Sequence, residues 1–175
     1  MQFVRYSGLI TSDDFSSRID RMNCFCYPVR VYYEDTDHGG VVYYANYLKF
    51  MERCRTEMLR AKGQEQDQLM KDLDLIFAVR RVEVDYLSPA KFNDQLLVTA
   101  RITQSSKVRL QFEQAIYRNK AATLPISGKI VDFEKLKTEN SLLCDAKIDI
   151  VSLSASQLRP KRIPDTLFEE LLSEH

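Results

Sequence analysis

The sequence predicts an α+β protein in which an antiparallel sheet accompanies one long helix. Residues 25–33 alternate between two faces with aromatic and β-branched side chains, the pattern of a one-sided strand. Apolar side chains then recur at steps of three and four over residues 47–61, which predicts an amphipathic helix of about four turns. One strand, one helix and a run of strands form an order in which a sheet can wrap the helix. The later strand-like runs are 82–86, 96–104, 107–118 and 142–153.

The ends of these elements carry residues suited to caps and turns. Asn46 is expected to cap the N-terminus of the long helix, and Gly63 is expected to end it. A short helical segment is expected over residues 66–73. Turns between neighbouring strands are expected at Asn93-Asp94 and Ser105-Ser106.

Composition fits one globular domain and excludes several classes of partner. The chain has 175 residues, 45% of them hydrophobic, and 25 basic residues balance 25 acidic ones. No net field therefore favours nucleic acid or an anionic membrane. No apolar run approaches the roughly 20 residues that span a bilayer. Residues 1–20 lack the apolar core of a signal peptide, so a cytoplasmic location is expected.

The cysteines and histidines do not form a metal-binding pattern. Only two histidines occur, and the four cysteines lack paired spacing, so free and mostly buried thiols in a reducing compartment are expected. Neither a metal nor a cofactor is predicted. Nucleophile-elbow, Walker and dinucleotide-binding motifs are also missing from the sequence. The residues in question are Cys24, Cys26, Cys54, Cys144, His38 and His175.

The segment 33–47 carries the residues best suited to chemistry. Two carboxylates, Asp35 and Asp37, and the glycine pair Gly39-Gly40 lie between a strand end and a helix start. Glycine lets a backbone approach a ligand closely, and a helix N-terminus offers N–H groups to a developing oxyanion. A carboxylate opposite these donors can attack an acyl carbon or activate water. The alternative is an acidic loop whose aspartates only form turns and caps.

Residues 30–57 resemble a known family. From Val31 they read V-Y-Y-E-D-T-D-x-G-G-V-V-Y-Y-A-N-Y-L-K-F-M-E-R-C-R-T-E. This stretch is similar to the signature of the 4-hydroxybenzoyl-CoA thioesterase family, and it is closest to the Tol-Pal-associated branch of acyl-CoA thioesterases. The similarity continues more loosely over residues 80–117 and resumes over 139–164. It implies a hotdog fold, in which an antiparallel sheet curls around the long helix, and hydrolysis of acyl-CoA to a carboxylic acid and CoA.

The resemblance also implies roles for individual residues. Asp37 falls on the family's nucleophile or general base, and the two roles are not distinguished. The backbone N–H of Tyr44 falls on the group that polarises the thioester carbonyl. Gly40 falls on the glycine that admits the substrate. Lys107 and Arg109 lie near the position that contacts the phosphates of CoA, although a solvated strand end is an equal interpretation. The family's sites lie at dimer interfaces, so a homodimer or homotetramer is expected.

Other assignments remain open at this stage. Tyr44 stands where the branch often carries His, so only its backbone N–H is assigned a role. His38 could orient Asp37 or face solvent. Glu52 could serve as the base, or it could pair with Arg55 three residues along the helix. A domain that only binds acyl-CoA or acyl carrier protein, and a dehydratase that relies on His38, are the alternative functions.

The expected domain organisation is simple. Residues 1–23 form an N-terminal extension, 24–164 the single hotdog domain, and 165–175 a tail with a short helix capped by Asp165. Residues 119–138 are interpreted as an insert between the last two strands. Its alternating Ile126, Ile130 and Phe133 predict an ordered extension, either an extra hairpin or a longer strand pair.

Overall fold

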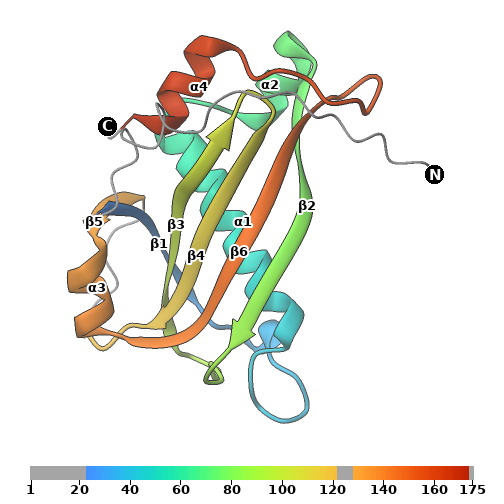
Figure 1. Ribbon diagram of the computed structural model, residues 1–175. Helices are drawn as coiled ribbons and strands as arrows, with labels where there is room; N and C mark the ends of the chain where they lie inside the picture. The colour runs from blue at the N-terminus through green and yellow to red at the C-terminus, as the bar shows by residue number, and fades with distance from the viewer. Residues whose placement is uncertain (1–22, 122–127, 174–175) are drawn as a thin grey trace.

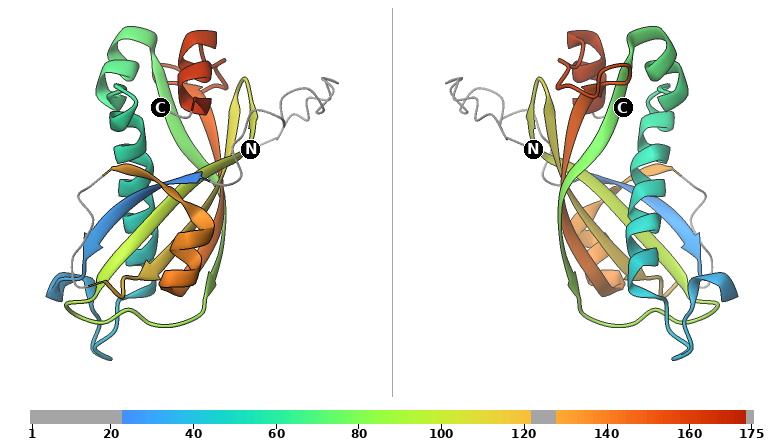
Figure 2. Two further views of the ribbon diagram at one scale, coloured as in Figure 1. Left: turned by 90° about the vertical axis from the view of Figure 1, so that its left-hand side faces the viewer. Right: turned by 90° about the vertical axis from the view of Figure 1, so that its right-hand side faces the viewer.

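The computed structural model describes residues 23–121 and 128–173, and these form a curved antiparallel sheet that wraps one long helix (Figures 1 and 2). The six strands lie in the order β2-β6-β4-β3-β1-β5, and α1 packs along one face of the sheet. The hotdog prediction is thus confirmed. The elements are β1 (Asn23–Arg30), η2 (Tyr33–Asp35), α1 (Tyr44–Ala61), α2 (Gln66–Leu73), β2 (Leu75–Tyr86), β3 (Gln95–Ser106), β4 (Arg109–Arg118), β5 (Lys129–Asp132), α3 (Phe133–Glu139), β6 (Ser141–Ser154) and α4 (Asp165–Leu172).

The long helix forms the core because its apolar stripe faces the sheet. Phe50, Met51 and Cys54 are fully buried there. The helix begins at Tyr44, three residues before the predicted start, so Asn46 lies inside the first turn and the N-cap prediction is wrong. Gly63 follows the C-terminal cap in the left-handed conformation, with φ of +74°, as the stop prediction required.

Backbone irregularities help the sheet to curve around α1. The β2–β6 register shifts between Val79 and Arg81, the β3–β4 register between Ile102 and Gln104, and the β4–β6 register between Ile116 and Tyr117. Such bulges bend a strand and increase its twist. The hairpin turn after β3 lies at residues 107–108, two residues beyond the predicted Ser105-Ser106. No helix among residues 23–121 and 128–173 is long and apolar enough to cross a membrane.

The insert is ordered where it is described, but only part of it is a strand. β5 pairs antiparallel with β1 and extends the sheet, as predicted. Phe133 instead begins α3, because the Asp132 side chain accepts a hydrogen bond from the Lys135 N–H and caps that helix. The hairpin interpretation is therefore wrong at Phe133. Ile126 and residues 1–22 lie outside the described residues.

A second, smaller core lies beneath α3 on the outer face of the sheet. Leu136 of α3 is buried there beside Tyr117 of β4, while α1 occupies the opposite face. The C-terminal helix α4 packs on the main core through Leu167 and Phe168. It begins at Asp165 with Pro164 as the cap residue, one position before the predicted cap.

Leu136→Ala is expected to lower the free energy of unfolding by about 2–4 kcal/mol, because it empties part of the second core. The turnover rate per folded chain should remain unchanged, since α3 lies on the face of the sheet opposite α1. Urea unfolding and steady-state kinetics measure the two quantities. Lys135→Ala, an exposed change on the same helix, is the control and should cost less than about 0.5 kcal/mol. A folded Leu136→Ala protein without turnover would contradict the interpretation that Leu136 contributes only to the stability of the second core.

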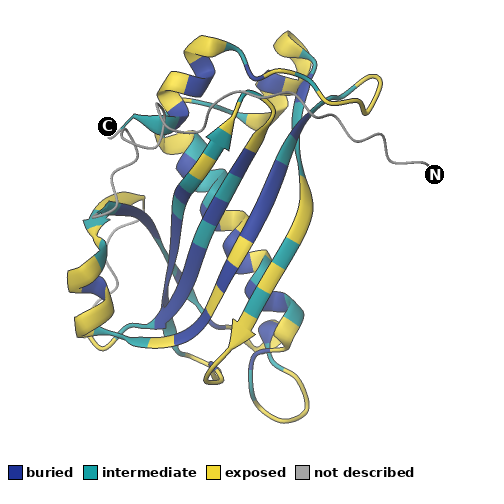
Figure 3. Cartoon of the chain, in the orientation of Figure 1, coloured by how far each residue is buried: buried dark blue, intermediate teal, exposed yellow. Residues whose placement is uncertain are grey.

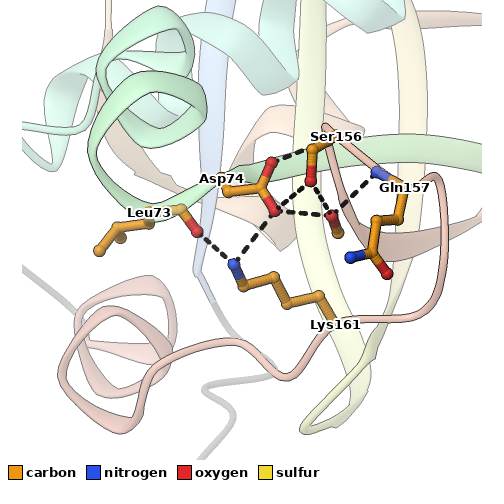
Figure 4. A network of polar contacts seen from close by, with 6 residues as sticks. Leu73, Asp74, Ser156, Gln157 and Lys161 are labelled. Carbon is orange, nitrogen blue, oxygen red and sulfur yellow. Dashed lines mark hydrogen bonds and ion pairs between the residues drawn. The ribbon is translucent and has the colours of Figure 1, made fainter.

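A polar latch, formed by Asp74, Ser154, Ser156 and Lys161, joins the α2–β2 junction to the loop after β6 (Figure 4). Asp74 adopts a left-handed conformation with φ of +48° at the end of α2. Its carboxylate accepts hydrogen bonds from the Ser154 hydroxyl at 2.6 Å and from the Ser156 N–H at 2.7 Å. Lys161 lies 3.5 Å from the same carboxylate and donates to the Leu73 carbonyl at 2.6 Å.

The latch predicts a pH-dependent contribution to stability. Hydrogen bonds from Ser154 and Ser156 lower the pKa of Asp74 to about 2, below the ordinary value near 3.9. Because the folded-state pKa is depressed, the contribution is present above about pH 4 and is lost as the pH falls toward 2. Asp74→Asn should therefore destabilise the protein at pH 6, and the difference from wild type should shrink toward pH 2.

Urea unfolding between pH 6 and pH 2 measures this difference. Asp72→Asn, at an exposed position on the same helix, is the control and should cost less than about 0.5 kcal/mol at pH 6. A deficit of Asp74→Asn that stays constant down to pH 2 would show that the carboxylate charge is not the source of the stabilisation.

Candidate active site

Asp35 is a structural carboxylate that shapes the start of the loop between β1 and α1. Its side chain is 8% exposed and accepts a hydrogen bond from the Tyr32 N–H at 2.8 Å. Its main-chain carbonyl accepts from the Tyr43 N–H at 2.9 Å and from the Asn46 side-chain amide at 2.9 Å. These bonds fix η2 against the first turn of α1.

The tip of the same loop is exposed (Figure 3). Asp37 opens a tight turn there. The Asp37 N–H donates to the Val41 carbonyl at 2.9 Å, and the Gly40 N–H donates to the Asp37 carbonyl at 3.0 Å. Thr36 and Val42 form a β-bridge beneath the turn. Gly40 has φ of +74°, a conformation that a residue with a Cβ adopts only with strain.

The backbone holds one oxygen of the Asp37 carboxylate and leaves the other without a hydrogen bond from the described residues. Its Oδ1 atom accepts a hydrogen bond from the Gly39 N–H at 2.8 Å. Among the described residues, no donor reaches its second oxygen. A Cβ at position 39 would approach Oδ1 to 3.1 Å, so glycine at this position leaves space beside the carboxylate. One carboxylate oxygen is held and the other faces solvent, an arrangement suited to a nucleophile or a general base.

The N-terminus of α1 carries N–H groups of the kind that the predicted oxyanion role requires. Tyr43 is the cap residue, and its side chain makes no capping hydrogen bond to the helix. The first N–H groups of a helix have no intrahelical acceptor, and they lie at the positive end of its dipole. Tyr44 is the first helical residue, so its backbone N–H is one of these groups. Tyr44 is 60% exposed, so its side chain is not part of the hydrophobic core.

A cluster of tyrosines surrounds this helix end. The Tyr86 hydroxyl at the end of β2 donates to the Tyr44 carbonyl at 3.1 Å, and the Tyr86 ring lies 5.4 Å from that of Tyr47. A side-chain hydrogen bond with Tyr44, and to a smaller extent the charge of Asp37, raise the pKa of Tyr43. Sequence reasoning did not identify Tyr86, because an aromatic residue in an alternating strand carries no further signal of a functional role.

Lys107 and Arg109 do not lie near this loop. They occupy the β3–β4 hairpin, while the loop contacts the residues just before β3, so roughly 35 Å of strand separates the two ends within one chain. Lys107 forms an ion pair with Asp165, and Arg109 forms one with Asp149 at 2.5 Å. A phosphate bound there would compete with both carboxylates.

Glu52 and Arg55 are not joined by a direct ion pair. Glu52 accepts a hydrogen bond from the Thr56 hydroxyl at 2.8 Å, and Arg55 donates to the Gln114 side chain at 2.6 Å. The predicted pairing is wrong because a buried amide acceptor lies closer to the guanidinium. Both residues line an apolar cavity of about 120 Å³ between α1 and the sheet. His38 lies exposed on the tip beside Asp37.

The four cysteines do not provide an alternative nucleophile. All four are buried and free, as predicted. Burial raises the pKa of Cys24, Cys26 and Cys144 to about 12, and it also raises the pKa of Cys54. A thiol with such a pKa stays protonated at neutral pH and reacts slowly.

Comparisons with known proteins show the family to which the chain is similar. Residues 39–124 match the family described as the thioesterase superfamily, a range that includes Gly40 and Tyr44 and begins two positions after Asp37. The acyl-CoA thioesterase YbgC of Haemophilus influenzae is 43% identical over 117 residues, which are 66% of this chain and 86% of that protein.

Two further similarities extend over more of the chain. The acyl-CoA thioester hydrolase YbgC of an Escherichia coli O6:H1 strain is 37% identical over 146 residues, 83% of this chain and 94% of that protein. A probable thioesterase from Bartonella henselae has a crystal structure with a TM-score of 0.66 and 30% identity, covering 81% of this chain and 99% of that one. With the loop, the helix end and the curved sheet in the arrangement described above, the chain belongs to the thioesterase superfamily.

Proposed function

We propose that this protein hydrolyses acyl-CoA thioesters to a carboxylic acid and free CoA. The observation that carries the proposal is the Asp37 carboxylate, held by one oxygen at the tip of the loop that leads into α1, whose cap residue Tyr43 makes no side-chain capping hydrogen bond. The names of the YbgC relatives, acyl-CoA thioesterase and acyl-CoA thioester hydrolase, support the same reaction.

The proposed site divides the chemistry between the loop and the helix. The thioester carbonyl oxygen accepts a hydrogen bond from the Tyr44 N–H, which stabilises the negative charge that develops on that oxygen. Asp37 either attacks the carbonyl carbon or removes a proton from an attacking water. In both cases the carbon–sulfur bond breaks and CoA leaves as a thiolate that takes up a proton. In the first case water then hydrolyses the mixed anhydride.

The proposal includes assembly of two or more copies. β2 is a 12-residue edge strand with Val79 52% exposed, and a long exposed edge favours pairing with another chain. A homodimer or homotetramer with sites at the interface follows from the family resemblance. Acyl carrier protein is an alternative carrier of the acyl group. Four free thiols fit a reducing, cytoplasmic setting.

A thiol-release assay with acyl-CoA esters of increasing chain length, and with an aromatic acyl-CoA, tests the function. Catalysis predicts many equivalents of free CoA per chain and a preference for one class of acyl group. Binding without release, measured by calorimetry with the same esters, would instead identify a domain that only binds acyl-CoA. Acyl-carrier-protein thioesters in a parallel assay test the alternative carrier.

A further inference from the structure

Asn46 occupies an unusual place for a polar side chain. It is 5% exposed, in the first turn of α1, and its side-chain amide donates a hydrogen bond to the Asp35 carbonyl at 2.9 Å. The Tyr43 N–H donates to the same oxygen at 2.9 Å. The two lone pairs of one carbonyl therefore receive two donors, both from the start of the helix.

The position of that carbonyl explains what the donors accomplish. Asp35 ends η2, and Asp37 lies two residues further along the loop. The opposite side of the loop is tied by the Thr36–Val42 bridge and by the Val42 N–H, which donates to the Ala90 carbonyl at 2.8 Å. The Asn46 amide is thus a side-chain contact that joins the base of the Asp37 turn to the helix whose N-terminal N–H groups bind the thioester carbonyl in the proposed function.

We propose that Asn46 is a positioning residue for hydrolysis, which sets the Asp37 carboxylate relative to the N–H groups at the start of α1. This inference rests on the proposed function. Asn46 acts through the Asp35 carbonyl and does not touch the substrate. Loss of the amide frees one side of that carbonyl, so the turn bearing Asp37 shifts relative to Tyr44. A displacement of about 1 Å at such a site can cost about 10²-fold in rate.

Kinetics of Asn46→Ala and Asn46→Ser, measured per folded chain, test the inference. We expect kcat to fall about tenfold or more in Asn46→Ala with KM little changed, and to recover in part in Asn46→Ser, which keeps a donor. Asn140→Ala is the matched control, because the Asn140 amide also donates to a main-chain carbonyl, that of Leu136, in α3. That variant should keep the wild-type kcat.

A second pair of variants changes the other donor to the Asp35 carbonyl, the Tyr43 N–H. These variants test the inference even if Asn46→Ala does not fold. Tyr43 has φ of −59°, which proline adopts, so Tyr43→Pro removes the N–H donor without backbone strain. Tyr43→Ala removes the same ring and keeps the N–H. We expect kcat of Tyr43→Pro to be about tenfold below that of Tyr43→Ala.

A double-mutant cycle with Asp37→Asn separates positioning from a general structural effect. If Asn46 acts through Asp37, adding Asn46→Ala to Asp37→Asn should lower the residual rate by less than about twofold. An equal loss in both backgrounds, or a wild-type kcat in Asn46→Ala, would overturn the inference. Lack of hydrolysis by the wild-type protein would instead overturn the proposed function, so the two failures are distinguishable.

Discussion

Asp37→Asn should lower kcat by at least about 10²-fold while the protein stays folded. The change keeps the side-chain shape, and the amide oxygen can still accept the hydrogen bond from the Gly39 N–H. It removes the negative charge that the proposed role as nucleophile or general base requires. Thiol-release kinetics measure the effect, and circular dichroism with urea unfolding checks the fold.

Asp35→Asn is the comparison that separates the roles of the two aspartates of the loop. Asp35 is buried and bonded to the Tyr32 N–H, so its charge is not available to a substrate. An amide oxygen at position 35 can accept the same hydrogen bond. We expect a loss in kcat much smaller than that of Asp37→Asn. A loss from Asp35→Asn equal to or greater than that from Asp37→Asn would mean that the reactive carboxylate has been assigned to the wrong residue.

Val79→Lys should prevent the proposed dimer or tetramer from forming and lower kcat per chain by about tenfold or more. Val79 lies exposed in the middle of edge strand β2, where a second copy would pair. Lysine on an edge strand opposes such pairing, because each copy would place a charge beside the other. The rate falls because the proposed site is built at the interface. Light scattering and thiol-release kinetics at one protein concentration measure both effects.

The opposite edge of the sheet supplies a matched control. Ile130 lies exposed on β5, the strand at the other edge, so Ile130→Lys places the same charge on an edge that is not proposed to pair. That variant should keep both its assembly and its rate. A wild-type protein that is a fully active monomer would remove the interface model altogether.

Much of the fold could be predicted because local pattern and tertiary burial agree along most of the chain. The apolar stripe of α1 and the alternating apolar residues of β3, β4 and β6 reflect the face of each element that packs in the main core. Phe133 departs from this because an apolar residue every third or fourth position also fits a helix. The cap that decides the matter, Asp132 on the Lys135 N–H, is a local signal that the alternation obscured.

The candidate site could be predicted only in part, because sequence shows residue types but not which contacts they make. The tip of the loop was found through its carboxylates and glycines. The different roles of Asp35 and Asp37 depend on burial. The sequence does not reveal this difference, because both residues are aspartates and lie only two positions apart. Asn46 suggested a cap because asparagine near a helix start usually serves as one. Lys107 and Arg109 suggested phosphate contacts, whereas distant carboxylates in the same chain already pair with them.

The strand order has a consequence for how the chain folds as it is synthesised. Among the described strands β2 hydrogen-bonds only to β6, and the register joins Leu75 to Ser154, across almost half of the sequence. At a synthesis rate of about 5–20 residues per second, β2 waits several seconds for its partner. During that interval both of its edges are open, although in the finished fold only one remains so. Pairing of β2 with β6 must close a long loop of chain, so this step is expected to be slow. Nascent chains that stop before β6 should therefore aggregate through β2, and binding of a chaperone to β2 would suppress this until β6 arrives.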